Sequence, residues 1–413
     1  MKRHLLALTA ASVLLATSAA SARSLEFWTM QLSPQLDGYM NALIQRYEAA
    51  HPGVKVKWVD LPWAEMERKV LTAIAAGQAP DVVNLNPQFA AKLAEFGALA
   101  EPEQHLSAAQ VASYLPAAWA GNCMDGKTFA LPWYVTVNLT LYRRGLLQDA
   151  GISAPPRSHA ELLTVAPKLA THGRHAYFPA LDGSHPLETL VAMGTPLLDA
   201  RGCAGFANDQ GAAAFGFYRD LYQRKWVPRN VVTEGHRKAV ELFVAGEVAM
   251  ISTGMQFLNF IKTSNADLYT DIDIAPPLAR PGTPPNLAVM NLAVPAASKQ
   301  KQAAFDFAAF VSNADNQLAF AKAVPVLPSS RASYGDAFLS TTPASGDLTD
   351  RARALSAQLA QQGQVLVPPM RAYSKLRNSY AIQLQAQMLG KQAPAAALQT
   401  VTTQWNRLLG CKP

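Results

Sequence analysis

Residues 25–87 constrain the fold more than any other part of this 413-residue chain, because two apolar patterns alternate there. Apolar residues recur at helical spacing in residues 36–47 and again in residues 66–74. Runs typical of strands precede, separate and follow these helices, at residues 25–29, 54–59 and 81–86. Asn86-Pro87 then has the pattern of a helix N-cap followed by proline at the first helical position. Strands that alternate with helices form a parallel sheet covered on both faces. The stretch therefore predicts an open α/β sheet.

The first residues have the pattern of an export signal. Lys2, Arg3 and His4 form a basic segment, residues 5–16 are apolar, and Ala20-Ser21-Ala22 is a small-x-small cleavage site. We expect residues 1–22 to be a cleavable signal peptide. No cysteine follows the apolar run as a lipidation site, and no later run approaches the ~20 residues that a membrane helix needs. We therefore expect a soluble, non-lipidated protein outside the cytoplasm, in a periplasm.

Charge and length limit the partners and the domain count. The formal charge is +7, and removal of Lys2 and Arg3 leaves +5 (7 − 2). The basic residues are scattered, without a run that could grip a phosphate backbone, so we expect no nucleic-acid partner. A mature chain of about 390 residues exceeds one ordinary hydrophobic core, so two lobes are expected. We expect a monomer.

Three cysteines, Cys123, Cys203 and Cys411, allow one intramolecular disulfide with three possible pairings. An oxidising compartment permits such a bridge. We favour Cys203–Cys411, with lone buried thiols as the alternative.

One pattern imitates a nucleotide-binding site. Residues 121–128, G-N-C-M-D-G-K-T, satisfy the G-x-x-x-x-G-K-T motif of phosphate loops. That motif needs a preceding strand and a following helix, so that backbone N–H groups face the phosphates. Here a helical segment precedes and a strand follows, and Asp125-Gly126 is a hairpin-turn signal. We therefore interpret residues 121–128 as a hairpin.

Catalytic and metal-binding patterns are sparse. The sequence contains no G-x-S-x-G and no H-E-x-x-H motif. His172 and His175 have metal-ligand spacing, but a glycine lies between them and no third ligand is evident. We expect no catalytic residue, no metal and no cofactor. The paired carboxylates of a glycan hydrolase cannot be recognised in sequence, so a secreted hydrolase remains an alternative.

Five aromatic residues stand near predicted strand ends or loop starts: Trp28, Trp63, Trp133, Tyr134 and Tyr373. Sugar sites combine flat rings, which pack on the C–H faces of pyranoses, with polar side chains that bond hydroxyls. Candidates of that second kind are Asn84, Asn86, Asp182, His185 and Gln256. Core packing is the alternative for each ring taken singly. Together these residues favour a polar cleft for a small molecule.

Several further segments carry a family resemblance. They are residues 44–56 (I-Q-R-Y-E-A-A-H-P-G-V-K-V), 76–83 (A-G-Q-A-P-D-V-V), 125–132 (D-G-K-T-F-A-L-P), 243–254 (F-V-A-G-E-V-A-M-I-S-T-G), 303–311 and 390–398. In this order they resemble the extracellular solute-binding proteins of ABC importers, in the sugar-binding branch that is maltose-binding-protein-like. The resemblance covers essentially all of the mature chain.

The resemblance implies a type II periplasmic-binding-protein fold, with a ligand cleft between two α/β lobes. The N-terminal lobe is expected at residues 23–136 plus 277–326, and the C-terminal lobe at 137–276 plus 327–413. Crossover segments are expected near residues 135–138, 274–277 and 325–328. The family also implies hinge closure on the ligand and docking on a membrane permease.

Pocket positions are carried over one by one. The resemblance implies ligand contacts at Trp28, Gln31, Trp63, Asn84, Asn86, Trp133, Tyr134, Asp182, His185, Met255, Gln256, Asn291 and Tyr373. Two departures stand out: Gln256 replaces a common Trp, and Ser158-His159 stands where the family often has Thr-Trp. Because Gln256 stands in place of a Trp that would stack on a sugar ring, we expect a solute that is smaller or more polar than a maltodextrin.

We thus expect a non-catalytic receptor that captures a mono- or oligosaccharide by lobe closure and delivers it to an ABC importer. A receptor for a charged solute, such as a glycerol phosphate or polyamine, is the alternative. A receptor for a charged solute requires a buried Arg or an acidic cluster in the cleft, and Arg371 is the candidate for such an Arg.

Overall fold

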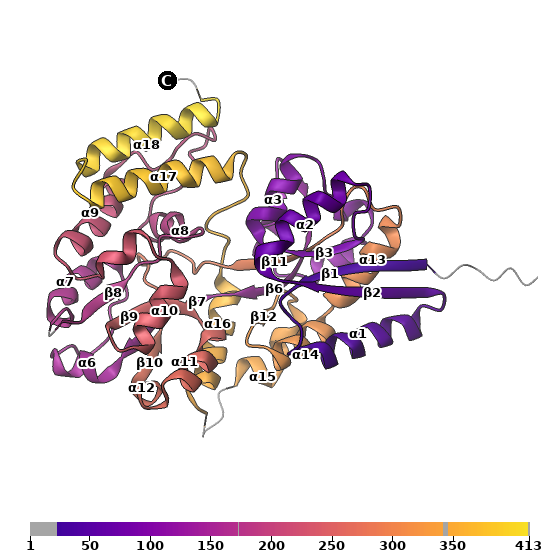
Figure 1. Ribbon diagram of the computed structural model, residues 1–413, viewed down its shortest axis with the longest axis horizontal. Coiled ribbons are helices and arrows are strands. Elements are labelled where there is room, and N and C mark those ends of the chain that lie inside the picture. The colour runs from indigo at the N-terminus through magenta and orange to yellow at the C-terminus, as the bar shows by residue number, and fades with distance from the viewer. Residues whose placement is uncertain (1–22, 172, 342–345, 412–413) are drawn as a thin grey trace, which may run out of the picture.

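A computed structural model describes residues 23–171, 173–341 and 346–411. The expected signal peptide and His172 lie outside these residues. The described elements form two groups, each around its own sheet, and the chain passes between them at the centre of Figure 1. We call the group around the six-stranded sheet the first lobe and the group around the four-stranded sheet the second lobe.

The first lobe is built on a mixed sheet with strand order β12-β6-β11-β3-β1-β2. Its strands are β1 (Arg23–Met30), β2 (Val54–Leu61), β3 (Val82–Leu85), β6 (Leu131–Thr136), β11 (Ala288–Ala293) and β12 (Leu327–Pro328). β1 runs parallel to β2 and β3, which confirms the parallel unit predicted from residues 25–87. β11 is antiparallel to β3 and β6, so the other half of the sheet departs from that pattern.

Helices cover both faces of this sheet, as the periodicity predicts. Its longer helices are α1 (Asp37–Ala50), α2 (Trp63–Ala75), α3 (Pro87–Glu95), α13 (Lys301–Val311) and α14 (Ala314–Ala323). Shorter ones are η1 (Pro102–Gln104), α4 (Ala108–Ala112), α5 (Pro116–Ala120), η4 (Ala332–Gly335) and α15 (Ala337–Ser340). α1 and α13 bury Leu43 and Phe307 against Phe27 of β1. α2 and α3 bury Val70 and Phe89 on a separate core.

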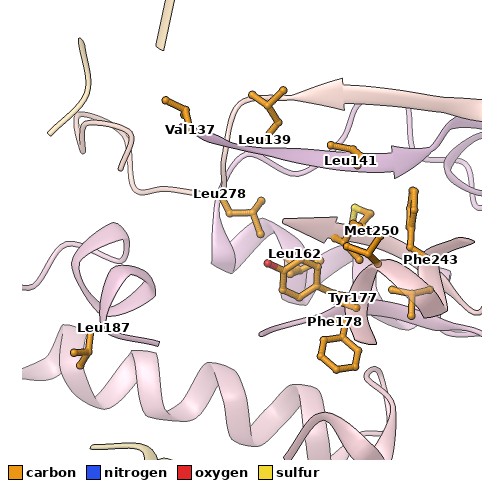
Figure 2. Close-up of a cluster of buried hydrophobic side chains, with 14 of the residues drawn as sticks. Val137, Leu139, Leu141, Leu162, Tyr177, Phe178, Leu187, Phe243, Met250 and Leu278 are labelled. Atoms are coloured by element: carbon orange, nitrogen blue, oxygen red, sulfur yellow. The ribbon is translucent and has the colours of Figure 1, made fainter. Parts of the chain in front are cut away.

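The second lobe is built on a sheet with strand order β10-β7-β9-β8. Its strands are β7 (Asn138–Arg143), β8 (His175–Phe178), β9 (Val248–Gly254) and β10 (Ile272–Ala275). Its helices are α6 (Arg144–Asp149), α7 (His159–Leu169), α8 (His185–Ala192), α9 (Asp209–Gln223), η2 (Arg229–Val232), α10 (His236–Val244), η3 (Met255–Phe257), α11 (Leu258–Ser264), α12 (Ala266–Asp271), α16 (Leu348–Gln362), α17 (Tyr373–Met388) and α18 (Pro394–Leu408). Figure 2 shows Leu139 and Leu141 of β7 in one buried layer with Tyr177 and Met250.

The passages between the sheets lie near the predicted crossovers, with one correction. β6 lies in the first sheet and β7 in the second, separated by Val137, within the crossover expected at residues 135–138. β12 pairs with β6 through Leu327 and Val135, so residues 327–328 belong to the first sheet. This differs from the expected boundary, which places them in the C-terminal lobe, because no sequence signal distinguishes a two-residue edge strand from the start of a linker.

The phosphate-loop pattern is a β-hairpin. β4 (Cys123–Met124) and β5 (Lys127–Thr128) pair antiparallel. Asp125 and Gly126 connect them with φ values of 53° and 78°, the left-handed conformation that this tight turn requires. β6 follows this hairpin, so no helix N-terminus is available to a phosphate group.

A disulfide joins Cys203 to Cys411, the pairing favoured from the sequence. Asn406 of α18 also accepts a hydrogen bond from the Ala204 backbone N–H. The bridge therefore attaches the end of the chain to the loop before α9. Among the described helices, none is long and apolar enough to cross a membrane.

Candidate functional site

Two adjoining cavities lie where the lobes meet. The outer chamber, about 260 Å³ in volume, is lined by both lobes: Pro87, Gln88, Thr136, Asn138, Ser184, His185, Glu188, His236, Gln256, Phe257, Asn286, Leu287, Ala288, Val365 and Val367. The inner chamber, about 80 Å³, extends into the second lobe, where its wall includes His159, Tyr177, Thr189, Phe217, Tyr218 and Ser252. Four residues line both chambers: Asn138, His185, Glu188 and Asn286. The junction is therefore polar.

The first lobe supplies its side of the outer chamber from element ends. Asn86 caps α3 by accepting a hydrogen bond from the Phe89 N–H at 2.8 Å, and Pro87 begins the helix, as the sequence predicts. This cap places Gln88 in the first turn, at the chamber wall. Thr136 ends β6 and Asn138 begins β7, so the crossover itself contributes polar side chains to the site.

A histidine pair forms part of the second-lobe wall. The rings of His185, at the start of α8, and His236, at the start of α10, stack with centroids 5.7 Å apart. Asp182 accepts a hydrogen bond from the His236 N–H at 2.9 Å, and His236 Nε2 lies 2.9 Å from the Thr253 hydroxyl. Burial lowers the pKa of His236 to about 4, and the neighbouring His185 adds to this effect. His236 is therefore a neutral imidazole at neutral pH.

Gln256 and Phe257 follow β9 in η3 and face the outer chamber. Gln256 Oε1 is buried and has no hydrogen-bond partner among the described residues. Its side chain folds back over Gly254, where a Cβ atom would displace the amide. The chamber wall thus contains an amide oxygen that is free to accept a hydrogen bond from a ligand.

Glu188, in the first turn of α8, accepts a hydrogen bond from the Ser184 hydroxyl. Tyr373, the first residue of α17, lines a small cavity that shares Gln88 with the outer chamber. Burial raises the pKa of Tyr373 to about 12, against the opposing effect of Arg377. Tyr373 therefore stays protonated beside the site and keeps its hydrogen-bond donor.

The structure brings together a minority of the residues predicted to contact a ligand. His185 and Gln256 line the outer chamber, Tyr373 adjoins it, and Asp182 holds the backbone of His236. The remaining predicted residues line neither chamber: Trp28, Gln31, Trp63, Asn84, Asn86, Trp133, Tyr134, Met255 and Asn291.

Several of these residues are core residues. Trp133 is fully buried and stacks on Phe320 at a centroid distance of 4.8 Å, so its ring belongs to the first-lobe core. Tyr134 packs on the same Phe320. These two rings therefore pack in the first-lobe core, outside both chambers. Met255 is 4% exposed and packs in the second-lobe core.

The others are held by the first sheet or lie on its surface. Asn84 and Asn291 are fully buried, and the Asn84 amide donates to the Asn291 carbonyl at 3.1 Å. Trp28 packs against the α2–α3 side of the sheet, and its indole N–H donates to Glu26. Trp63 is 45% exposed at the start of α2, and Gln31 is exposed after β1.

Most of the other polar residues of the site carried no recognisable signal in the sequence. Gln88, Asn138, Glu188, His236 and Asn286 line the chambers but were not predicted. Gln88 could have been found, because it follows a predicted strand end and helix cap. Glu188 lies in a helix, α8, that sequence reasoning did not identify.

Arg371 and His175 both lie outside the two chambers. Arg371 is exposed and pairs with Asp125 at 2.7 Å, so it does not supply a buried cation to the cleft. His175 starts β8, away from the chambers. Across residues 23–171, 173–341 and 346–411, no group of three or more His, Cys, Asp or Glu could hold a metal ion.

Comparison with known proteins agrees with the fold. A family model described as bacterial extracellular solute-binding protein matches residues 33–318. One similar crystal structure is that of a putative oligosaccharide periplasmic-binding protein from Synechococcus sp. MITs9220 in complex with zinc. Its sequence is 37% identical to this chain, the TM-score is 0.87, and the match covers 94% of this chain and 99% of that chain. The diacetylchitobiose binding protein of Streptomyces coelicolor is 25% identical over 402 residues, 94% of this chain and 90% of that protein.

A shorter match involves proteins of Brucella abortus that are named as putative binding proteins. They are 24% identical over 273 residues, and the match spans 66% of their length, just under two thirds.

Proposed function

Because this chain belongs to the family of bacterial extracellular solute-binding proteins, we propose that it is a periplasmic receptor that captures a mono- or oligosaccharide and delivers it to an ABC importer. The observation that carries the carbohydrate assignment is the polar junction between the chambers, where Asn138, His185, Glu188 and Asn286 meet. Amide, imidazole and carboxylate groups bond sugar hydroxyls, and Phe257 supplies an aromatic face. One relative is named as a diacetylchitobiose binding protein, and another, crystallised with zinc, as a putative oligosaccharide periplasmic-binding protein.

The mechanism that we propose is conformational. A solute in the outer chamber touches Gln88 and Thr136 of the first lobe and His185 and Gln256 of the second. Because the solute binds the closed arrangement of the lobes more tightly than the open one, it shifts the population toward the closed state. The proposed lobes are residues 23–136 plus 277–340 and residues 137–276 plus 341–413, with the second boundary moved past β12, η4 and α15. The lobes move about the three crossover segments.

The export and assembly that we propose follow from the same role. Residues 1–22 are removed as a signal peptide, the mature chain is not lipidated, and it acts as a monomer that docks on permease subunits in the inner membrane. The family and the similar structures are binding proteins, and we propose that this chain has no catalytic activity.

A thermal-shift panel on the mature chain tests this proposal. The panel contains maltose, N,N′-diacetylchitobiose and mannitol, with glucose 6-phosphate, sn-glycerol 3-phosphate and spermidine as charged comparisons. A neutral saccharide or polyol at 100 times its Kd adds about 2.7 kcal/mol to the free energy of unfolding, which is a measurable shift. No shift with any saccharide at millimolar concentration would contradict the proposal. Release of reducing ends from oligosaccharides at enzymatic rates would support the hydrolase instead.

A further inference from the structure

The inner chamber has the features of a built binding site. It is an extension of the outer chamber into the second lobe, with a volume of about 80 Å³. A water-sized group needs about 10–15 Å³ by this measure, so the inner chamber holds roughly five to eight such groups. That is the size of the terminal part of a sugar, such as an exocyclic group with the adjacent ring atoms.

His159 in the inner-chamber wall lacks a partner. Its side chain is 6% exposed, and its ring meets Phe217 edge to face at 5.0 Å. Nδ1 is buried without a hydrogen-bond partner among the described residues. Burial lowers the pKa of His159 to about 4, so the ring is neutral at neutral pH. A neutral imidazole offers one N–H donor and one acceptor, and leaving the buried Nδ1 unused is costly.

Glu188 stands at the junction of the two chambers. Its Oε1 accepts a hydrogen bond from Ser184, and no hydrogen bond from the described residues reaches its Oε2. No Lys or Arg of the described chain lies within ion-pair distance of this carboxylate, and none lines either chamber. Oε2 is therefore available as an acceptor for a ligand hydroxyl, and its negative charge opposes the approach of a second anion.

We propose that the inner chamber is the recognition subsite for the neutral, hydroxyl-bearing end of the solute, with Glu188 and His159 as its specificity-determining residues. This inference rests on the proposed receptor function and narrows its ligand to a neutral saccharide or polyol. A hydroxyl donates to Glu188 Oε2 at the junction. A second ligand group exchanges a hydrogen bond with the His159 ring. Phosphorylated and carboxylated solutes are excluded, because no cation in the chambers offsets Glu188.

Calorimetric titration of the mature chain tests the subsite with two variants and a control. Glu188→Gln keeps the shape and removes the charge. It should weaken binding of the best neutral saccharide by about tenfold, as for loss of a hydrogen bond to a charged group. His159→Phe keeps an aromatic ring and should weaken binding about threefold to tenfold. Glu234→Gln makes the same charge change at an exposed position outside both chambers and should stay within about twofold.

The outcomes separate this inference from the proposed function. If the wild-type chain binds no neutral saccharide or polyol, both fail. If it binds one, and Glu188→Gln binds it as tightly as Glu234→Gln, the subsite alone is overturned. Tighter wild-type binding of glucose 6-phosphate than of glucose would also overturn it. The thermal midpoint of each variant reports its folding, and Glu188→Gln decides the matter if His159→Phe does not fold.

Discussion

The imidazole rings of His185 and His236 lie nearly parallel, with centroids 5.7 Å apart and 5° between their planes. The two residues begin two different helices, α8 and α10, and both face the outer chamber. Asp182 fixes the backbone of His236, and Gly235 permits this contact, because a Cβ atom there would collide with the Asp182 carboxylate. The pair therefore presents two ring edges to a ligand without a positive charge on His236.

This arrangement predicts a pH-dependent stability. Burial holds the pKa of His236 at about 4 in the folded state, below the value of about 6.5 in an unfolded chain. The unfolded state therefore binds more protons, and the free energy of unfolding falls as the pH is lowered from about 6.5 to 4. Burial also lowers the pKa of His159 to about 4, so His159 adds a further loss of unfolding free energy over the same pH range.

His236→Gln tests this, since the amide can still bond Thr253 but does not titrate. Urea unfolding at pH 7 and pH 5 should show a smaller loss of stability in the variant than in the wild type. An equal loss in both proteins would contradict the account.

Trp133 is predicted to matter for stability rather than for ligand contact. It is fully buried against Phe27 and Phe320. Trp133→Ala should lower the free energy of unfolding by about 3–5 kcal/mol, because it leaves a large cavity. Trp63→Ala is the control, since Trp63 is 45% exposed and the change should stay within about 0.5 kcal/mol. Urea unfolding measures both. A Trp133→Ala chain that unfolds like the wild type but loses its ligand would restore the pocket assignment.

Gln256 is predicted to lower the stability of the ligand-free chain and to strengthen ligand binding. Its buried Oε1 has no partner in the ligand-free chain, which costs about 1–3 kcal/mol. Gln256→Leu removes that cost at similar volume, so the thermal midpoint should stay the same or rise. The same change removes a ligand acceptor and should weaken saccharide binding about tenfold. Thermal denaturation and calorimetry on one preparation measure both effects; a variant that keeps full affinity would exclude Gln256 from ligand contact.

The disulfide is predicted to stabilise the second lobe. Cys203 and Cys411 are separated by 208 residues, and loss of such a bridge typically costs about 2–5 kcal/mol. Cys411→Ser should lower the free energy of unfolding by that amount. Dithiothreitol should reproduce the loss in the wild type and add nothing in the variant. Cys123→Ser is the control, because Cys123 is not in the bridge. Equal stability of Cys411→Ser and the wild type would contradict this.

Much of the fold could be predicted because it depends on local patterns. The helices of residues 36–47 and 66–74 correspond to α1 and α2, and the Asn86-Pro87 cap was found from two residues. The hairpin at Asp125-Gly126 followed from turn chemistry. The passage from the first sheet to the second near Val137 followed from the family resemblance and not from a local pattern, since an extended run carries no mark of the sheet in which it pairs.

The site was predicted less well, because burial depends on tertiary packing. Trp133 and Asn84 follow the strand-end logic of a cleft, yet both side chains point into the first-lobe core. Glu188 and Asn286 reach the chambers only because the crossovers bring the two lobes together. His159 was noted as a departure from the family pattern, and its place in the inner chamber appeared only in three dimensions.

The crystal structure of the mature chain with the neutral saccharide or polyol that stabilises it most tests the central claim most directly. The account predicts one ligand molecule that spans both chambers, in contact with Gln88 or Thr136 of the first lobe and with Glu188 and His159 of the second. A ligand bound elsewhere, with both chambers occupied by water alone, would contradict it.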